Sequence, residues 1–324
     1  MVPETIIAEG YHPMKLHRED QTVLDLIKAA ARPPLYTVSP VEARAVSAAS
    51  RTVMQEAAPD VAACRDLTGA GVPLRLYRGS GTAADAVLPC LVFYHGGGWV
   101  IGDLDSHDVV CRQLANATGA CVIAVDYRLA PEAKFPAAVD DSKAATAWII
   151  GNAAELQIDP ARIAVGGDSA GANLAAVMAI MARDGDLPPI GYQMLIYPVT
   201  DLAAVHPSYD RIVEGYLLTT TTMKWFRDHY LNNEAEQADW RASPLRAATL
   251  AGTATAFVVT CSHDPLCDEG KAYAERLENE GVQVTAMHFS DHMHAFFTMG
   301  KFIKASGQII AAMSGALRAH WGMA

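Results

Sequence analysis

The sequence predicts an α/β fold with a mostly parallel, doubly wound sheet of about eight strands, flanked by helices and carrying a helical cap. Three observations predict it. From residue 90 onward, short apolar runs alternate with segments of helical periodicity. Glycine-rich turns follow two of these runs, at 95–98 and 167–171. The stretch between 197 and 256 lacks a strand pattern, and long inserts in compact domains are typically lids or binding segments.

The beginning of the chain, 1–55, predicts helices that are separate from the sheet. An apolar stripe ends before Pro33, and an alanine-rich segment follows at 41–54. Alternating side chains within 61–78 indicate an antiparallel hairpin. The later strands are expected at 91–95, 121–126, 163–167, 192–197, 256–261 and 284–289. The later helices are expected at 106–118, 137–152, 171–184, 268–280 and 304–321.

This pattern predicts one α/β domain with an insertion. We assign 56–199 and 249–324 to the domain and 200–248 to the cap insertion, which the helices of 1–55 complete. Within the insertion, 219–231 has apolar side chains on one face and a threonine run at its start, which predicts a helix. The alternative is a helical extension that points away from the sheet.

Composition excludes several classes of protein. Of 324 residues, 51% are hydrophobic and 19% are charged, which is typical of a globular chain. The formal net charge of −11 disfavours nucleic acid and anionic membranes as partners. No apolar run approaches the roughly 18 residues of a membrane span. The first residues lack the pattern of a secretory signal. The six cysteines include no C-x-x-C pair, so we expect them to be reduced and buried, in a cytoplasmic protein.

Residues 167–171 read GDSAG and fit G-x-S-x-G, the turn that holds a serine between a strand and a helix. The apolar run at 163–166 precedes it, and a helical pattern follows from Ala172. So tight a turn needs glycines, because larger side chains would collide. The motif predicts Ser169 as a nucleophile. The alternative is a glycine-rich helix start with a serine N-cap.

Residues 95–98 read HGGG and follow the apolar run 90–94. Backbone N–H groups in such a loop stabilise an oxyanion, which is what a serine nucleophile requires. A phosphate-binding loop is the alternative, but Trp99 and Ile101 occupy positions where that motif needs glycine. We expect His95 to support the loop structurally.

A serine nucleophile needs a base, and the base needs an acid that fixes its tautomer. In this arrangement the acid and then the histidine follow the serine, each after a later strand. Asp264 comes three residues after the strand 256–261, and Pro265 biases it away from helical angles. Asp268 and Glu269 are better placed to begin the next helix, where carboxylates favour the dipole.

The base is His292 or His294, since both follow the strand 284–289. Periodicity does not distinguish the two. The spacing H-x-H is also that of metal ligands, but the sequence offers no matching cluster elsewhere, so we predict no metal.

At this point the chain resembles the bacterial hormone-sensitive-lipase family of α/β-hydrolase carboxylesterases. The matching blocks, in family order, are 94–102 (YHGGGWVIG), 126–138 (DYRLAPEAKFPAA), 166–173 (GGDSAGAN), 264–269 (DPLCDE) and 294–297 (HAFF). The match covers about 70–320. The resemblance implies Ser169 as nucleophile, Asp264 as acid and His294 as base. It also implies an oxyanion hole made by the N–H groups of Gly97, Gly98 and Ala170.

The chain departs from the family next to the base. Ala295 stands where the family usually has glycine, and Asp291 and His292 replace small and apolar residues. The added methyl group is expected to cost little, but the hydrogen bonds around His294 differ from the family's.

The resemblance implies a serine carboxylesterase that hydrolyses short- to medium-chain acyl esters through an acyl-enzyme, without cofactor or metal. The alternatives are the same residues acting on an amide, lactone or formamide, and a non-catalytic receptor on this fold. A small-molecule ester is the expected partner. The C-terminal helix is expected to pack on the core and could also support a homodimer.

Overall fold

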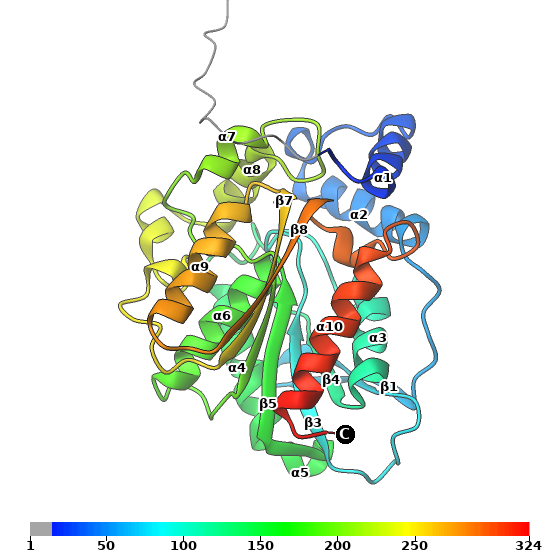
Figure 1. Ribbon diagram of the computed structural model, residues 1–324, viewed down its shortest axis with the longest axis vertical. Helices are drawn as coiled ribbons and strands as arrows, with labels where there is room; N and C mark the ends of the chain where they lie inside the picture. The colour runs from blue at the N-terminus through cyan, green and yellow to red at the C-terminus, as the bar shows by residue number, and fades with distance from the viewer. Residues whose placement is uncertain (1–14, 324) are drawn as a thin grey trace, which may run out of the picture.

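The computed structural model describes residues 15–323 as a three-layer α/β structure, with helices on both faces of one sheet (Figure 1). Residues 1–14, which belong to the segment 1–55 expected to contribute to the cap, and Ala324 lie outside the described residues. Four helices, α1, α2, α7 and α8, gather at the end of the sheet toward which strands β7 and β8 point.

The sheet has eight strands in the order β1-β2-β4-β3-β5-β6-β7-β8. They are β1 (Ala63–Gly69), β2 (Val72–Arg78), β3 (Leu88–Tyr94), β4 (Cys121–Val125), β5 (Ile158–Asp168), β6 (Tyr192–Ile196), β7 (Thr255–His263) and β8 (Val284–Met293). The hairpin β1–β2 and the pair β2–β4 are antiparallel, and the other neighbours are parallel. The predicted mostly parallel sheet of eight strands is confirmed.

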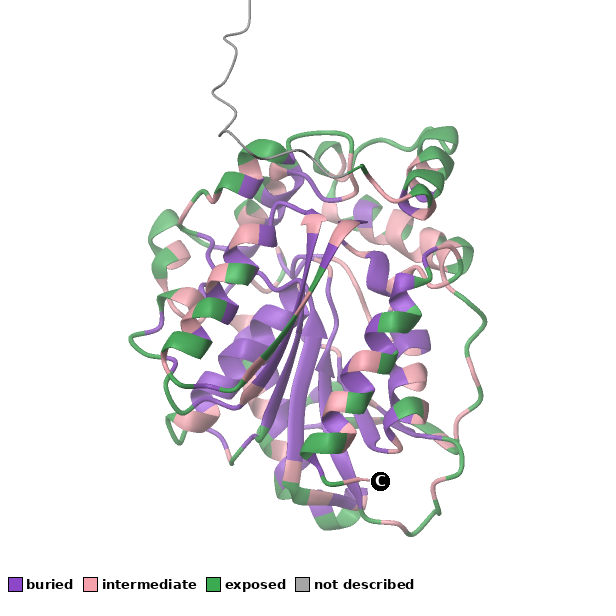
Figure 2. Ribbon diagram, viewed as in Figure 1, coloured by how far each residue is buried: buried purple, intermediate pink, exposed green. Residues whose placement is uncertain are grey.

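The helices are α1 (Arg18–Ala29), α2 (Pro40–Met54), α3 (Asp108–Thr118), α4 (Ala137–Gly151), α5 (Ala153–Leu156), α6 (Ala170–Arg183), α7 (Pro207–Arg211), α8 (Thr220–Tyr230), α9 (Cys267–Asn279) and α10 (Ala305–His320). Helices α3 and α10 cover one face of the sheet, and α4, α6 and α9 cover the other. Buried residues follow the central strands and the helix faces turned toward them (Figure 2).

The core accounts for several expectations about single elements. In α10 the side chains Ile309, Met313 and Leu317 are buried, as packing on the core requires. Five of the six cysteines are buried, but Cys64 on the edge strand β1 is exposed, so that part of the prediction is wrong. Within 15–323, none of the helices combines the length and the apolarity that a bilayer crossing requires.

Strands β7 and β8 extend further than the sequence predicts. Pairing is interrupted after Cys261 and resumes where His263 lies opposite Met293. Asp264 therefore follows β7 directly instead of after a three-residue loop, and His292 belongs to β8 rather than to a loop. A bulge of this kind restores pairing after an irregular residue, which apolar periodicity does not reveal.

The N-terminal helices form hydrogen bonds with segments at the carboxyl end of the parallel strands. From α1, the buried Asp20 accepts hydrogen bonds from His292 and from the N–H of Met293, at 2.6 and 2.9 Å. From α2, Arg44 donates to the carbonyl oxygens of Val100 and Ala130, each at 2.8 Å. Helix α1 thus holds the end of β8, and α2 holds the segments that follow β3 and β4.

Helix α8 begins where a threonine caps it: Thr219 accepts a hydrogen bond from the N–H of Thr222. The expected helix at 219–231 is therefore present. At its end, the ring of Tyr230 is stacked on Trp99 at 4.1 Å between centroids. A Cβ on Gly98 would collide with the ring of Phe226. Helix α8 therefore lies directly on the loop after β3.

Helix α6 approaches the end of β3 so closely that only glycine fits between them. A Cβ on Gly171 would overlap the carbonyl oxygen of Tyr94, and a Cβ on Gly167 would overlap the same atom. Because the obstacle is backbone, it cannot move aside as a side chain would. The glycines therefore set the distance between α6 and the sheet.

We predict that Gly171→Ala lowers the free energy of unfolding by on the order of 3 kcal/mol, because the methyl group must push backbone apart. The matched control is Gly315→Ala in α10, where an added Cβ meets open space. That change should raise the free energy of unfolding by about 1 kcal/mol, since alanine favours helix. Urea unfolding of both variants measures this. Equal effects of the two substitutions would contradict the close approach.

Candidate active site

Ser169 lies at the sharp turn between β5 and α6. Its backbone has φ 54° and ψ −120°, a conformation that side chains rarely adopt. The N–H of Ser169 donates to the carbonyl oxygen of Ile196 at 2.8 Å, which holds the strained turn to the neighbouring strand. The strand–turn–helix context expected for G-x-S-x-G is present.

Three side chains from distant parts of the chain form a hydrogen-bonded series. The Oγ of Ser169 lies 2.9 Å from Nε2 of His294, and Nδ1 of His294 lies 2.7 Å from Oδ2 of Asp264. Asp264 is fully buried, while Ser169 and His294 are 8% and 5% exposed. An unprotonated carboxylate accepts only, so Nδ1 carries the proton and Nε2 can accept from the serine hydroxyl.

The surroundings hold both partners of that series in place. The second oxygen of Asp264 accepts the N–H of Leu266 at 2.8 Å, and the Cys261 thiol lies 3.5 Å from the oxygen that faces His294. The ring of Tyr197 packs against His294 at 4.3 Å. Ala295 adopts φ 72°, a left-handed conformation that explains why glycine suits this position, yet His294 still reaches Ser169.

The residues that the sequence left as alternatives lie elsewhere. Asp268 pairs with Arg211 at 2.9 Å. Glu269 is buried, where it accepts the N–H of Thr200 at 2.7 Å, and burial raises its pKa to about 8. His292 is turned to Asp20 rather than to the serine.

The glycine loop after β3 lies beside the serine turn. Gly97 and Gly98 both have positive φ, 119° and 58°. Ala170 is the first residue of α6, and N–H groups in the first turn of a helix have no carbonyl partner within it. These are the three residues whose N–H groups the family resemblance implies as oxyanion donors.

Asp168, the residue before the serine, joins the two turns, a role that the G-x-S-x-G motif does not predict. It is buried, and its Oδ1 accepts the N–H of Gly96 at 2.9 Å and lies 2.8 Å from Nε2 of His107. Burial acts to raise the pKa of Asp168, but the His107 and His294 imidazoles and the Gly96 N–H outweigh it and lower the pKa. The sequence does hold a signal for this role: Asp168 is a carboxylate next to an apolar run, and a carboxylate buried there must have hydrogen-bond partners.

His95 supports the loop structurally, as expected. Its ring is stacked on Tyr127 at 4.3 Å, and its Nδ1 lies 2.8 Å from the carbonyl oxygen of Gly96. Burial, followed by the neighbouring His107 imidazole, lowers the pKa of His95 to about 4. The ring is therefore neutral at pH 7.

Comparisons with known proteins agree with this geometry. A protein family described as having the alpha/beta hydrolase fold matches residues 91–298. The chain is 42% identical to the carboxylic ester hydrolase LipN of Mycobacterium tuberculosis over 256 residues, which cover 77% of this chain and 67% of that protein. It is 36% identical to the ethyl acetate hydrolase of Pseudomonas putida, over 95% of this chain and 100% of that protein.

Solved structures resemble the whole described fold. An alpha/beta hydrolase enzyme from the metagenome of Lake Arreo is 40% identical with a TM-score of 0.90, over 95% of this chain and 99% of that one. A hyperthermophilic esterase of Pyrobaculum calidifontis is 34% identical with a TM-score of 0.88, over 94% of this chain and 99% of that one.

We predict that acid destabilises the protein partly through His95. The pKa of His95 is about 4 in the folded protein, whereas an imidazole in the unfolded chain has the ordinary value of 6.5. The unfolded chain therefore binds the proton more readily. Stability present above pH 6.5 is therefore lost as the pH falls toward 4, by on the order of 3 kcal/mol.

Urea unfolding at pH 7.0 and 4.5 measures that loss. His95→Gln should be less stable than the parent at pH 7 but should lose less on acidification, because glutamine does not titrate. A pH dependence identical to that of the parent would contradict the role of His95.

Proposed function

The chain belongs to the hormone-sensitive-lipase branch of the α/β-hydrolase fold, and from that premise we propose that it is a serine carboxylesterase in which Ser169, His294 and Asp264 carry out the hydrolysis. One observation carries the proposal. The hydroxyl of Ser169, the imidazole of His294 and the carboxylate of Asp264 are hydrogen-bonded in series, at 2.9 and 2.7 Å. In such a series the histidine takes the proton of the serine, and the carboxylate orients the histidine and stabilises its charge.

The first half of the reaction forms an acyl-enzyme. Ser169 attacks the ester carbonyl as His294 takes its proton on Nε2, and Asp264 stabilises the resulting imidazolium. The N–H groups of Gly97, Gly98 and Ala170 receive the oxyanion, at about 3 kcal/mol for a single donor in comparable enzymes. His294 then gives the proton to the leaving alcohol. Water repeats the sequence and releases the acid.

We assign the cap to α1, α2 and the insertion 200–248. Support comes from the contacts of Phe226 and Tyr230 with the loop after β3, and from Asp20 and Arg44 at the same edge of the sheet. Phe226 of α8 lies against Gly98. Since an ester would place its carbonyl oxygen beside the N–H of Gly98, Phe226 would limit the space for the acyl group next to that carbonyl. This favours short to medium acyl chains. Cytoplasmic location and dimerisation stay predictions from the sequence.

We predict that Ser169→Ala lowers kcat on a p-nitrophenyl ester by on the order of 10⁶, as loss of the nucleophile does in a comparable triad. Ser80→Ala, after β2 at the opposite end of the sheet, should leave kcat unchanged. Mass spectrometry after treatment with an organophosphate should find the label on Ser169. Turnover of the Ser169 variant near that of the parent would exclude it as nucleophile.

We predict that Asp264→Asn lowers kcat about 10⁴-fold, the size of effect that the same exchange has in other serine triads. The asparagine keeps an oxygen for the Leu266 N–H, but its amide stabilises the wrong tautomer of His294. The control is Asp268→Asn, the acid that pairs with Arg211 on the surface. Steady-state kinetics measures kcat of both variants, and thermal melting shows that both are folded. A comparable loss of kcat in both variants would exclude Asp264 as the acid of the triad.

A further inference from the structure

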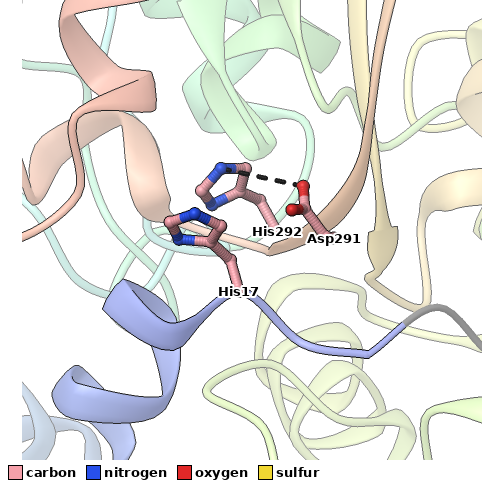
Figure 3. Close-up of side chains that lie close together, drawn as sticks. All are labelled: His17, Asp291 and His292. Atoms are coloured by element: carbon pink, nitrogen blue, oxygen red, sulfur yellow. Dashed lines mark ion pairs between the residues drawn. The ribbon is translucent and has the colours of Figure 1, made fainter.

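A second cluster of polar side chains lies where the chain leading into α1 meets the end of β8. Figure 3 shows His17 beside the neighbouring residues Asp291 and His292. Each residue offers one nitrogen or oxygen atom that could ligate a metal, and these three atoms lie within 4.8 Å of one another. The backbone brings them together, because the N–H of His17 donates to the carbonyl oxygen of Asp291 at 2.7 Å.

His292 has the orientation of a metal ligand. Its Nδ1 lies 2.6 Å from Oδ2 of Asp20, whose other oxygen accepts the N–H of Met293. A fully buried carboxylate at this distance accepts a hydrogen bond from the protonated Nδ1 of His292. The lone pair of the imidazole is then on Nε2. Nε2 lies 3.9 Å from Oδ1 of Asp291. Metal-bound histidines characteristically donate their other N–H to a carboxylate in this way.

His17 is the N-cap of α1, and its Nδ1 accepts the N–H of Glu19 at 3.3 Å. Zinc at Nε2 requires the other tautomer, in which Nδ1 gives up this bond and turns its proton toward Oε2 of Glu19, 3.8 Å away. The same oxygen accepts the N–H of Lys304 at 2.9 Å. The side chains of His17 and Asp291 are 32% and 37% exposed. An ion can therefore enter from solvent and keep water, while His292 and Asp20 fix the inner side of the cluster.

We propose that His17, Asp291 and His292 form a zinc-binding site that fastens α1 to the end of β8. Two imidazoles and one carboxylate are ligands that zinc prefers, whereas magnesium and calcium prefer oxygen alone. Asp291 supplies a negative charge at the ion, and Asp20 and Glu19 place further negative charge near the two imidazoles. Small side-chain rotations bring the three ligand atoms to the roughly 2.0–2.2 Å from zinc that such ligands adopt. Water completes the tetrahedron.

The site is separate from the three residues that carry the proposed hydrolysis. It lies two residues before His294 on the chain, so the ion would hold the strand that positions the base without contacting the substrate. Its role is structural: it adds a cross-link between the N-terminal segment and the C-terminal strand. Ligands that are far apart in sequence, at 17 and 291, make this cross-link effective, because it closes a long loop in the unfolded chain.

The test is isothermal titration of metal-free, full-length protein with zinc chloride, with thermal melting in EDTA and in excess zinc. We expect one zinc per chain and a melting temperature higher by on the order of 5 °C at about 100 times the dissociation constant. His17→Gln and Asp291→Asn should each weaken binding by at least about 10-fold. His320→Gln, which alters a histidine at the end of α10, should bind as the parent does.

Asp291→Asn alters a partly exposed side chain, so its melting temperature in EDTA should match that of the parent. His17→Gln also changes the N-cap of α1, so its melting temperature in EDTA should fall by no more than a few degrees. Cooperative melting of both variants shows that they fold. Zinc bound equally well by His17→Gln and Asp291→Asn would place the ion elsewhere, including at His294, and overturn the proposal. So would a titration without saturable binding, or a loss of affinity as large in His320→Gln as in the ligand variants.

Discussion

The contact between the turn at Ser169 and the end of β3 determines the rest of the site. Glycines at 167 and 171 let the backbone of that turn meet the carbonyl of Tyr94, and Asp168 crosses the same junction to hold Gly96. The strained serine and the loop of Gly97 and Gly98 are therefore positioned by one rigid junction. Preorganisation of this kind matters because donors that need not reorient cost nothing when charge develops on the substrate.

Two aspartate–histidine pairs lie near the end of β8, and only one of them belongs to the proposed triad. Asp264 orients His294, and Asp20 orients His292 with similar geometry, at 2.7 and 2.6 Å. What separates their roles is the third member, because Ser169 lies within reach of His294 alone of the two. Breaking either buried pair would leave a carboxylate without its partner, which is costly inside a protein. Both pairs therefore also hold the strand end in place.

The sequence predicted the strands and the main helices, because periodicity and glycine motifs are local. It also named Ser169 and Asp264, which the structure brings together with His294. It could not choose between His292 and His294 without the family resemblance, since the deciding partner, Asp20, lies 272 residues from His292. It also placed His292 in a loop and ended the strand before Asp264 at Cys261, because the bulge after Cys261 extends strand pairing without any apolar signal. Such long-range pairings are set by tertiary packing rather than by local propensity.

The N-terminal helices hold both halves of the proposed machinery at once. Helix α1 holds the strand end before His294 through Asp20, and α2 holds the loop that follows Gly98 through Arg44 and the carbonyl of Val100. A displacement of this helical pair would therefore disturb the base and the oxyanion loop together, rather than only uncover the site. Since α8 also packs on Gly98 through Phe226, the proposed cap would act on the positions of the proposed catalytic groups as well as on which acyl groups enter. Under the proposed function, selection of the substrate and alignment of the reacting groups are thus coupled through the same contacts.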